Sequence, residues 1–201
     1  MDNKRVPKQV RGIETRNRII RSGLSLFSEK GLHGTSSREI AAHAGVAIGS
    51  FYIYFKDKRA LFIEILQKHR INMMEILDNF SIEVSGVNDR SVLMRKLIEA
   101  IWQAHNSIRD FDKIADMLRN QDKEINGILE KQETKVLNQV ISLLELNSDQ
   151  LRKKDVALSA MMVTMIIREF MHTAPPSEHR EENNRIVNEL VDMISLYLFK
   201  I

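Results

Sequence analysis

Residues 35–61 hold two short stretches of helix-forming sequence on either side of one glycine, and this pattern restricts the fold more than any other in the chain. Ser36 and Glu39 stand at capping-box spacing, so a helix is expected to begin directly after the serine. Gly45 stands where a helix end favours a left-handed backbone. A second helix follows at once. Two short helices around a tight turn predict a helix-turn-helix over about residues 36–55.

The second of these helices, expected from about residue 47 to residue 55, has one apolar side and one exposed side. Phe51 and Phe55 are four residues apart and therefore face the same way, toward a core. Small residues stand at the N-terminal end, where the second helix of a helix-turn-helix meets base edges in the major groove. Because bulk at this end would hold the helix away from DNA, Gly49 and Ser50 favour a DNA-reading helix.

The composition excludes several other classes of fold and site. The 201 residues are 43% hydrophobic, enough to fill a core, and include only three prolines and eight glycines. Sparse helix breakers, and the lack of any sustained period-two pattern, predict an all-α fold. The sequence contains no cysteine, so disulfides and thiolate metal sites are excluded. No metal or other cofactor is expected.

Charge is distributed unevenly along the chain, although the formal net charge is only +3. Residues 1–70 hold 14 Lys or Arg against 6 Asp or Glu, whereas residues 71–201 hold 16 against 21. A basic part joined to an acidic part is the polarity expected of a DNA-binding head on a body that does not touch DNA. Taken alone, the split is equally compatible with ordinary solvated lysines and arginines.

The first dozen residues are basic and lack an apolar core, so neither a secretory signal nor a membrane anchor is expected there. We expect a flexible arm ahead of the first helix. Such an arm could reach into the minor groove or along the DNA backbone, or it could remain a tail without contacts. The charges concerned are Lys4, Arg5, Lys8 and Arg11.

Helical periodicity continues through most of the remaining sequence. The stretch 81–89 contains a glycine and an asparagine and is expected to form a loop. The predicted helices cover residues 15–27, with Gly31 as the stop, 57–80, 90–107, 110–119, 122–146, with the pattern broken at Gly127, and 180–199.

Residues 156–167 form a helical stretch that is apolar nearly all round. A surface helix carries only one apolar stripe, so this helix is expected to be buried on more than one side. A membrane span needs about 20 apolar residues, and charged residues stand close to both ends of this stretch, so no span is expected. Pro175 and Pro176 end the helix.

Residues 35–61 read T-S-S-x-x-I-A-x-x-A-G-V-x-x-G-x-F-Y-x-Y-F-x-x-K-x-x-L and resemble the signature of TetR-family transcriptional regulators. The resemblance implies about nine helices, with a helix-turn-helix DNA-binding domain over residues 1–60 and a helical regulatory and dimerisation domain over residues 61–201. In that family the last two long helices form a four-helix bundle with those of a second subunit, which would account for the doubly apolar helix. Homodimerisation is therefore expected through about residues 155–173 and 180–199.

A dimer would bind a palindromic operator in double-stranded DNA, with half-sites about one helical turn (roughly 34 Å) or slightly more apart. The family's usual mode is repression by occluding a promoter, relieved when a small molecule binds the body. A cytoplasmic, nucleoid-associated protein follows from this. The rival hypothesis is a co-activator or adapter that keeps the fold without reading an operator. An enzyme is not expected, because the sequence carries no phosphate loop, zinc-protease pair or nucleophile elbow.

The resemblance also assigns DNA contacts by position. Ser37 corresponds to a phosphate contact, and Arg38 corresponds to a base contact that could be bidentate to guanine. Lys58 corresponds to a lysine at the next helix start that grips a phosphate. The tip of the recognition helix corresponds to Ile48, Gly49 and Ser50. Two tyrosines correspond to positions that meet the DNA backbone and neighbouring bases, namely Tyr52 and Tyr54.

Alternatives stay open at three positions of the recognition helix. Ile48 replaces a polar or basic residue found in other members, so it could contact a thymine methyl group or serve only in packing. Ile53 replaces what is often an aromatic or polar group, which leaves its contact unassigned. Tyr52 could belong mostly to the core, as helix-turn-helix aromatics often do.

The body is expected to hold an effector pocket. Its middle helices mix apolar bulk with a few polar groups, which suits an adaptable apolar cavity, although the same stripes are the ordinary composition of a core. His105 and Arg109 are one helical turn apart in sequence and could bind an anion together or face solvent. The candidate lining residues are Trp102, His105, Arg109, Phe111, Met117, Met161, Met162 and Met165.

Overall fold

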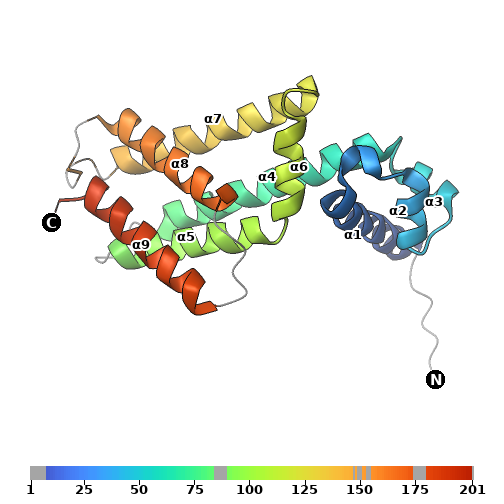
Figure 1. Cartoon of the computed structure of the whole chain (residues 1–201), viewed down its shortest axis with the longest axis horizontal. Coiled ribbons are helices and arrows are strands. Elements are labelled where there is room, and N and C mark those ends of the chain that lie inside the picture. Colours follow the sequence, from blue (N-terminus) through green and yellow to red (C-terminus); the bar gives the residue numbers. More distant parts are fainter. Residues whose placement is uncertain are drawn as a thin grey trace. The chain divides into compact units, whose positions relative to one another are not determined.

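The computed structural model describes residues 8–83, 90–146, 148, 151–152, 155–173 and 180–200. This part of the chain contains nine helices and no strand, apart from one isolated bridge between Leu151 and Phe199, which confirms the all-α prediction (Figure 1). The helices are α1 (Lys8–Gly34), α2 (Ser37–His43), α3 (Ile48–Tyr54), α4 (Lys58–Glu83), α5 (Arg90–Asn106), α6 (Arg109–Leu118), α7 (Lys123–Glu145), α8 (Val156–Thr173) and α9 (Arg180–Leu198).

The first helix begins earlier than its periodicity predicts. Lys8 and Arg11 stand on α1, so the prediction that they belong to a flexible arm is wrong, whereas Lys4 and Arg5 lie outside the described residues. Gly31 has φ 72° and interrupts the helical backbone at the predicted stop. Only glycine adopts this left-handed conformation at no steric cost, which explains why the break falls there.

Two later boundaries also differ from the expected ones. α4 continues to Glu83, so the first part of the expected loop is helical, and residues 84–89 lie outside the described residues. α7 runs unbroken through Gly127, because one glycine weakens a helix without ending it. The prolines at 175 and 176 also lie outside the described residues.

The helices pack into two compact units, each with its own core. The head unit extends to His69 and also includes Ile108–Ile125, whereas the body unit comprises Arg70–Ser107 and Asn126–Ile201. Helix α6 thus belongs to the head unit, where it packs against α1. The sequence-based division at residue 60 had placed this helix with the regulatory domain.

Three phenylalanines from three helices form the centre of the head unit. The ring of Phe62 in α4 lies 4.5 Å from that of Phe111 in α6 and 5.3 Å from that of Phe27 in α1, and all three side chains are fully buried. Gly23 permits the close approach of α1 and α4, because a Cβ there would lie 2.6 Å from Cδ2 of Leu61. Helix α6 is therefore part of the hydrophobic core that supports the helix-turn-helix.

Ion pairs add a second connection between α4 and the chain around α6. Arg59 donates two hydrogen bonds of 2.8 Å to the two carboxylate oxygens of Asp122 and lies 2.8 Å from Glu124. Oδ1 of Asp122 also accepts from the backbone N–H groups of Glu124 and Ile125, so this carboxylate caps α7. Deeper in the unit, Nε2 of His69 lies 3.4 Å from the buried carboxylate of Asp112.

The Arg59 hydrogen bonds lower the pKa of Asp122 from 3.8 to about 2. Because the folded-state pKa is the lower one, the stabilisation is complete above about pH 3.8 and is lost as the pH falls toward 2. Asp122→Asn keeps an oxygen that can cap α7 but removes the charge. We expect it to lower the free energy of unfolding at pH 7 by up to about 1 kcal/mol, as for partly exposed ion pairs.

Urea unfolding of wild type and variant at several pH values would test this. Asp122→Ala is the matched variant, and its loss of the cap should cost roughly a further 1 kcal/mol. The difference between wild type and Asp122→Asn should narrow below pH 3.8. Equal stability of the two proteins at every pH would contradict the predicted role of the ion pair.

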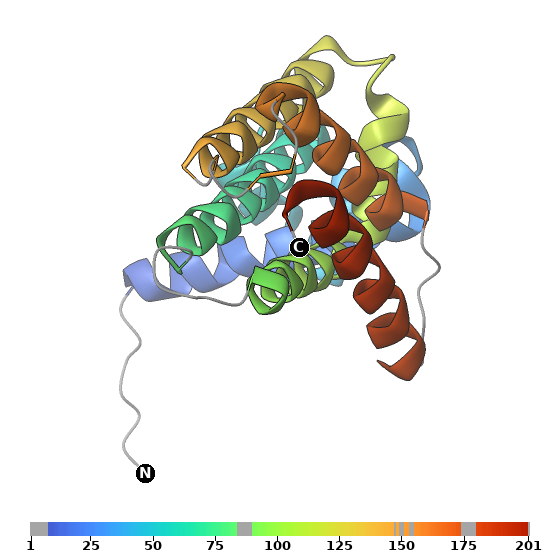
Figure 2. The same cartoon turned by 90° about the vertical axis from the view of Figure 1, so that its left-hand side faces the viewer.

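The body unit is a helical bundle in which α5 lies beside α9, as Figure 2 also shows. Ile98 of α5 and Val191 and Ile194 of α9 are among its fully buried side chains. α7 runs alongside the C-terminal part of α4 (Figures 1 and 2), where the amide of Gln139 donates to Asp78. This packing buries one side of each helix against a shared core.

Helix α8 has two apolar sides, of which only one is covered within the single chain. Its inward side is buried through Ser159, Ala160 and Val163. Its outward side exposes between 40% and 51% of four side chains spaced i, i+3, i+4 and i+7, namely Leu158, Met161, Met162 and Met165. We call these four residues the α8 outer face. The expectation of burial on more than one side is therefore not met within one chain.

Among the described residues, α8 is also the one helix whose length and mean hydropathy of 1.2 would allow it to cross a membrane. Only 22% of that stretch is buried within the chain. Length and composition alone are weak evidence for a span, because core helices of soluble proteins share them.

Candidate nucleic-acid interface

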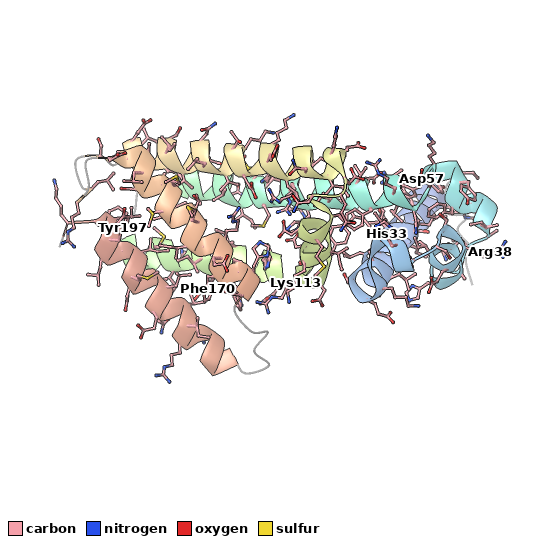
Figure 3. All side chains as sticks on the ribbon, turned by 45° about the horizontal axis from the view of Figure 1, so that its top comes forward. His33, Arg38, Asp57, Lys113, Phe170 and Tyr197 are labelled. Carbon is pink, nitrogen blue, oxygen red and sulfur yellow. The ribbon has the colours of Figure 1, made fainter. Side chains whose placement is uncertain are left out.

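The first helix of the helix-turn-helix begins as its sequence predicts. The backbone N–H of Glu39 donates to Oγ of Ser36 over 3.1 Å, which is one half of the expected capping box. The Glu39 carboxylate instead binds the ammonium of Lys30 at 2.5 Å, and this hydrogen bond lowers the pKa of Glu39. The cap leaves Ser37 half-buried and Arg38 exposed in the first turn of α2. Figure 3 shows the Arg38 side chain at the edge of the head unit.

The turn between α2 and α3 depends on Gly45, whose φ is 65°. Its left-handed backbone lets the N–H of Val46 donate to the carbonyl of Ala41 at 3.0 Å, while its own N–H donates to Ala42. These two bonds form a Schellman-type helix end, which satisfies carbonyls that would otherwise lack partners. Gly45 thereby sets the direction in which α3 leaves α2.

The second helix buries two aromatic rings and exposes the opposite side. Phe51 and Phe55 are 0% and 3% exposed, and their rings lie 5.8 Å apart. Tyr52 is 56% exposed, so the alternative that it belongs mostly to the core is wrong; its ring meets Phe51 only edge-on. Ile48 and Ile53 are 38% and 77% exposed, so neither is a core residue. At the helix start, Gly49 is exposed and Ser50 half-buried.

Two of the assigned DNA contacts are engaged inside the protein. The hydroxyl oxygen of Tyr54 lies 3.4 Å from the position that a Cβ on Gly12 would take. This half-buried ring therefore points toward α1. The ammonium of Lys58 donates to the backbone carbonyls of Thr35 at 2.7 Å and His33 at 3.3 Å. A DNA phosphate that binds this ammonium would therefore have to share it with these two backbone carbonyl groups.

Sequence reasoning missed a second group of basic residues in the head unit. Arg18 and Arg21 of α1 and His43 of α2 line a shallow hollow, and all three are exposed. A guanidinium nitrogen of Arg18 lies 3.9 Å from the position of a Cβ on Gly45. The i, i+3 spacing of the two arginines was the signal that could have placed them on one face of α1.

The candidate effector residues do not all lie in one unit. Arg109, Phe111 and Met117 belong to the head unit, where Phe111 is a core residue and Met117 is 66% exposed. The five others belong to the body unit, but the three methionines among them, Met161, Met162 and Met165, stand on the α8 outer face. These residues are therefore not gathered in one unit, because an apolar residue type does not reveal which side of a helix is inward, and the effector pocket stays a prediction.

His105 and Arg109 also stand on different helices, since α5 ends at Asn106 and α6 begins at Arg109. They are therefore not one turn apart on a single helix, and a shared anion site stays a prediction. His105 instead meets His172 of α8, with ring centroids 5.1 Å apart at 82°. Trp102 lies one turn earlier in α5, and its ring lies 5.2 Å from that of Phe170 (labelled in Figure 3).

Comparison with known proteins identifies both units. The family model described as bacterial regulatory proteins, tetR family, matches residues 19–65, which include the whole helix-turn-helix. A second model, described as a tetracyclin repressor-like C-terminal domain, matches residues 91–198. The HTH-type transcriptional regulator YdgC of Bacillus subtilis (strain 168) is 29% identical over 117 residues, which cover 57% of this chain and 60% of YdgC. The chain spans 34–60% of the length of the first curated relatives that it matches.

Solved structures share the fold over most of the chain. A TetR-family transcriptional regulator from Mesorhizobium loti has a TM-score of 0.74 at 19% identity, covering 94% of this chain and 99% of that one. FadR from Bacillus subtilis, solved in complex with stearoyl-CoA, has a TM-score of 0.67 at 19% identity, covering 90% and 98%. Because one family model covers more than half of the sequence and the other includes the helix-turn-helix, this chain belongs to the TetR family of transcriptional regulators.

Proposed function

We propose that the protein is a sequence-specific repressor that binds a palindromic operator as a homodimer and is released by a small-molecule ligand. The observation that carries the proposal is the exposed first turn of α2 and outward side of α3, mounted on a basic head. Arg38 is exposed where a guanidinium could form a bidentate pair with guanine. We assign phosphate and backbone contacts to Ser37 and Tyr52, and close approach to the groove to Gly49 and Ser50.

The α8 outer face supports dimerisation. A contiguous apolar stripe exposed to water is unfavourable, and association with an identical stripe around a two-fold axis would bury it. α9 contributes Met193 and Leu196, which are 47% and 53% exposed. A four-helix bundle built from α8 and α9 of two subunits uses both surfaces. The same burial accounts for the hydropathy of α8 without a membrane, so we place the protein in the cytoplasm.

The ring pairs of the body unit support an effector site there. Trp102 with Phe170 and His105 with His172 bring aromatic and imidazole groups of α5 and α8 together. Rings of this kind suit an apolar ligand that carries a few polar atoms. A structural neighbour solved with stearoyl-CoA supports the capacity of this fold to hold such a molecule.

Duplex binding measured by fluorescence anisotropy tests the central claim. Fragments selected from the organism's own genome should bind tightly at low salt, with log affinity falling by about 0.9 per neutralised phosphate for each unit of log salt. Arg38→Ala should lose about 1–3 kcal/mol of discrimination for the selected fragment. Arg38→Lys is the matched control, since it keeps the charge but loses the bidentate fork and should recover only non-specific affinity.

The opposite outcome is equally well defined. A folded protein without measurable duplex affinity at low salt would belong to the class of co-activators or adapters. Unchanged affinity and selectivity in Arg38→Ala would remove Arg38 from the interface and leave the base reading to α3 alone.

A further inference from the structure

The exposed side chains of α3 are those of Ile48, Tyr52 and Ile53, which are hydrocarbon apart from the Tyr52 hydroxyl group. No charged residue occurs in this helix. Residues four apart share a side of a helix, so Ile48 lies above Tyr52, at the border of the buried side that carries Phe51, and Gly49 lies above Ile53, on the side away from it. The two isoleucines are 38% and 77% exposed. Water contact is unfavourable for these side chains, so the free protein gains nothing from exposing them.

Gly49 lies within this surface, and neither its contacts nor its backbone conformation requires a glycine there. A Cβ at this position would meet no other atom within 4 Å, and its φ is not positive. Glycine generally weakens a helix relative to alanine, so the fold itself gives no preference for it here. The missing side chain leaves room for something outside the protein to approach the backbone of α3.

The charged residues near α3 indicate what kind of molecule approaches this helix. Arg38 and Lys56, on either side of the helix in sequence, are both exposed, and the N-terminal 70 residues carry the chain's excess of cations. This pattern complements a duplex, in which phosphates flank each groove. Within the major groove, thymine alone presents a methyl group, whereas the other bases present donors and acceptors that a hydrocarbon cannot satisfy.

We propose that Ile48 is a specificity-determining residue that packs against the C5 methyl group of a thymine in each operator half-site. The proposal rests on the proposed function and adds the base that α3 reads. Ile48 is the first residue of α3, and the N-terminal residues of a recognition helix are the ones that meet base edges. Guanine reading is left to Arg38 of α2.

Replacing thymine with deoxyuridine removes only the methyl group and tests the contact directly. In a duplex selected by the wild-type protein, each thymine is replaced singly and binding is measured at fixed salt. At one or more positions in each half-site, we expect the affinity to fall about fourfold, the factor for burial of one CH2-sized group. Ile48→Ala should bind the thymine duplex more weakly and show no further loss with deoxyuridine at that position.

Ile53→Ala is the matched comparison, because it removes the same atoms from the other end of the exposed surface and should keep the deoxyuridine effect. Wild-type affinity that no deoxyuridine changes, or a full deoxyuridine effect in Ile48→Ala, would overturn the proposal. Either result leaves duplex binding itself intact. If the wild type bound no duplex at all, the proposed function would fail instead.

Gly49→Ala provides a second, independent test of close approach. The added methyl group has no neighbour in the protein, so thermal unfolding should occur at the same or a higher temperature. Affinity for the selected duplex should nevertheless fall at least tenfold, because the methyl group would stand between α3 and the base edges. Undiminished affinity in a stable Gly49→Ala variant would contradict the approach of α3 on which the thymine contact depends.

Discussion

Phe62→Ala is expected to lower the free energy of unfolding of the head unit by about 3–5 kcal/mol, the usual cost of removing a buried phenylalanine. The side chain is fully buried, and its ring lies against those of Phe27 and Phe111. Phe27 and Phe111 are held in place by the packed helices α1 and α6, so their rings cannot move far enough to fill the space. The substitution therefore leaves a cavity. Urea unfolding followed by circular dichroism would give the loss as a lower midpoint.

Two further variants make this result interpretable. Phe62→Leu keeps much of the volume and should lose considerably less. Tyr52→Ala removes an aromatic ring of similar size that is 56% exposed, so its stability should change by no more than about 0.5 kcal/mol. A loss below 1 kcal/mol in Phe62→Ala would mean that the three rings do not hold α1, α4 and α6 together.

Met165→Arg is expected to convert the proposed dimer to a monomer. Met165 is 51% exposed on the α8 outer face and would be buried in the proposed dimer, where an arginine would lose its hydration without gaining a partner. A monomer has a single head and loses the second half-site. The affinity for a palindromic duplex should therefore fall by a factor of about 10² or more, whereas binding to one half-site should be retained.

Leu146→Arg is the control, since Leu146 is an 81% exposed leucine of the body unit outside α8 and α9. Analytical ultracentrifugation should find this variant dimeric and the Met165→Arg variant monomeric. A dimeric Met165→Arg protein with unchanged operator affinity would show that the subunits associate through another surface.

Local features of the fold could be predicted because their causes lie within one helical turn. The Ser36 cap, the left-handed Gly45 and the burial of Phe51 and Phe55 each depend on residues a few positions apart. The position of α6 could not be predicted in this way. Phe111 joins the head unit through contacts with rings far away in the sequence, and such contacts leave no periodic signal.

The sequence could identify positions that are candidates for DNA contacts, but it could not predict which groups of the protein surround each of them. Arg38 and Tyr52 are exposed as a base or backbone contact requires, whereas the ammonium of Lys58 is bound to carbonyls of Thr35 and His33. The sequence could not reveal this because the carbonyl partners are backbone groups, which every residue carries. For α8, apolar residues on both sides could not distinguish the inward side from the α8 outer face.

The contribution of α6 to the head core limits how the protein can be divided or recombined. A fragment that stops at residue 70 would retain the helix-turn-helix but lose Phe111, leaving Phe27 and Phe62 open to water. Grafting this reader onto another body would leave the same gap unless the recipient supplied a ring at the same place. The part of the protein that can be transplanted as a working module is therefore discontinuous in sequence.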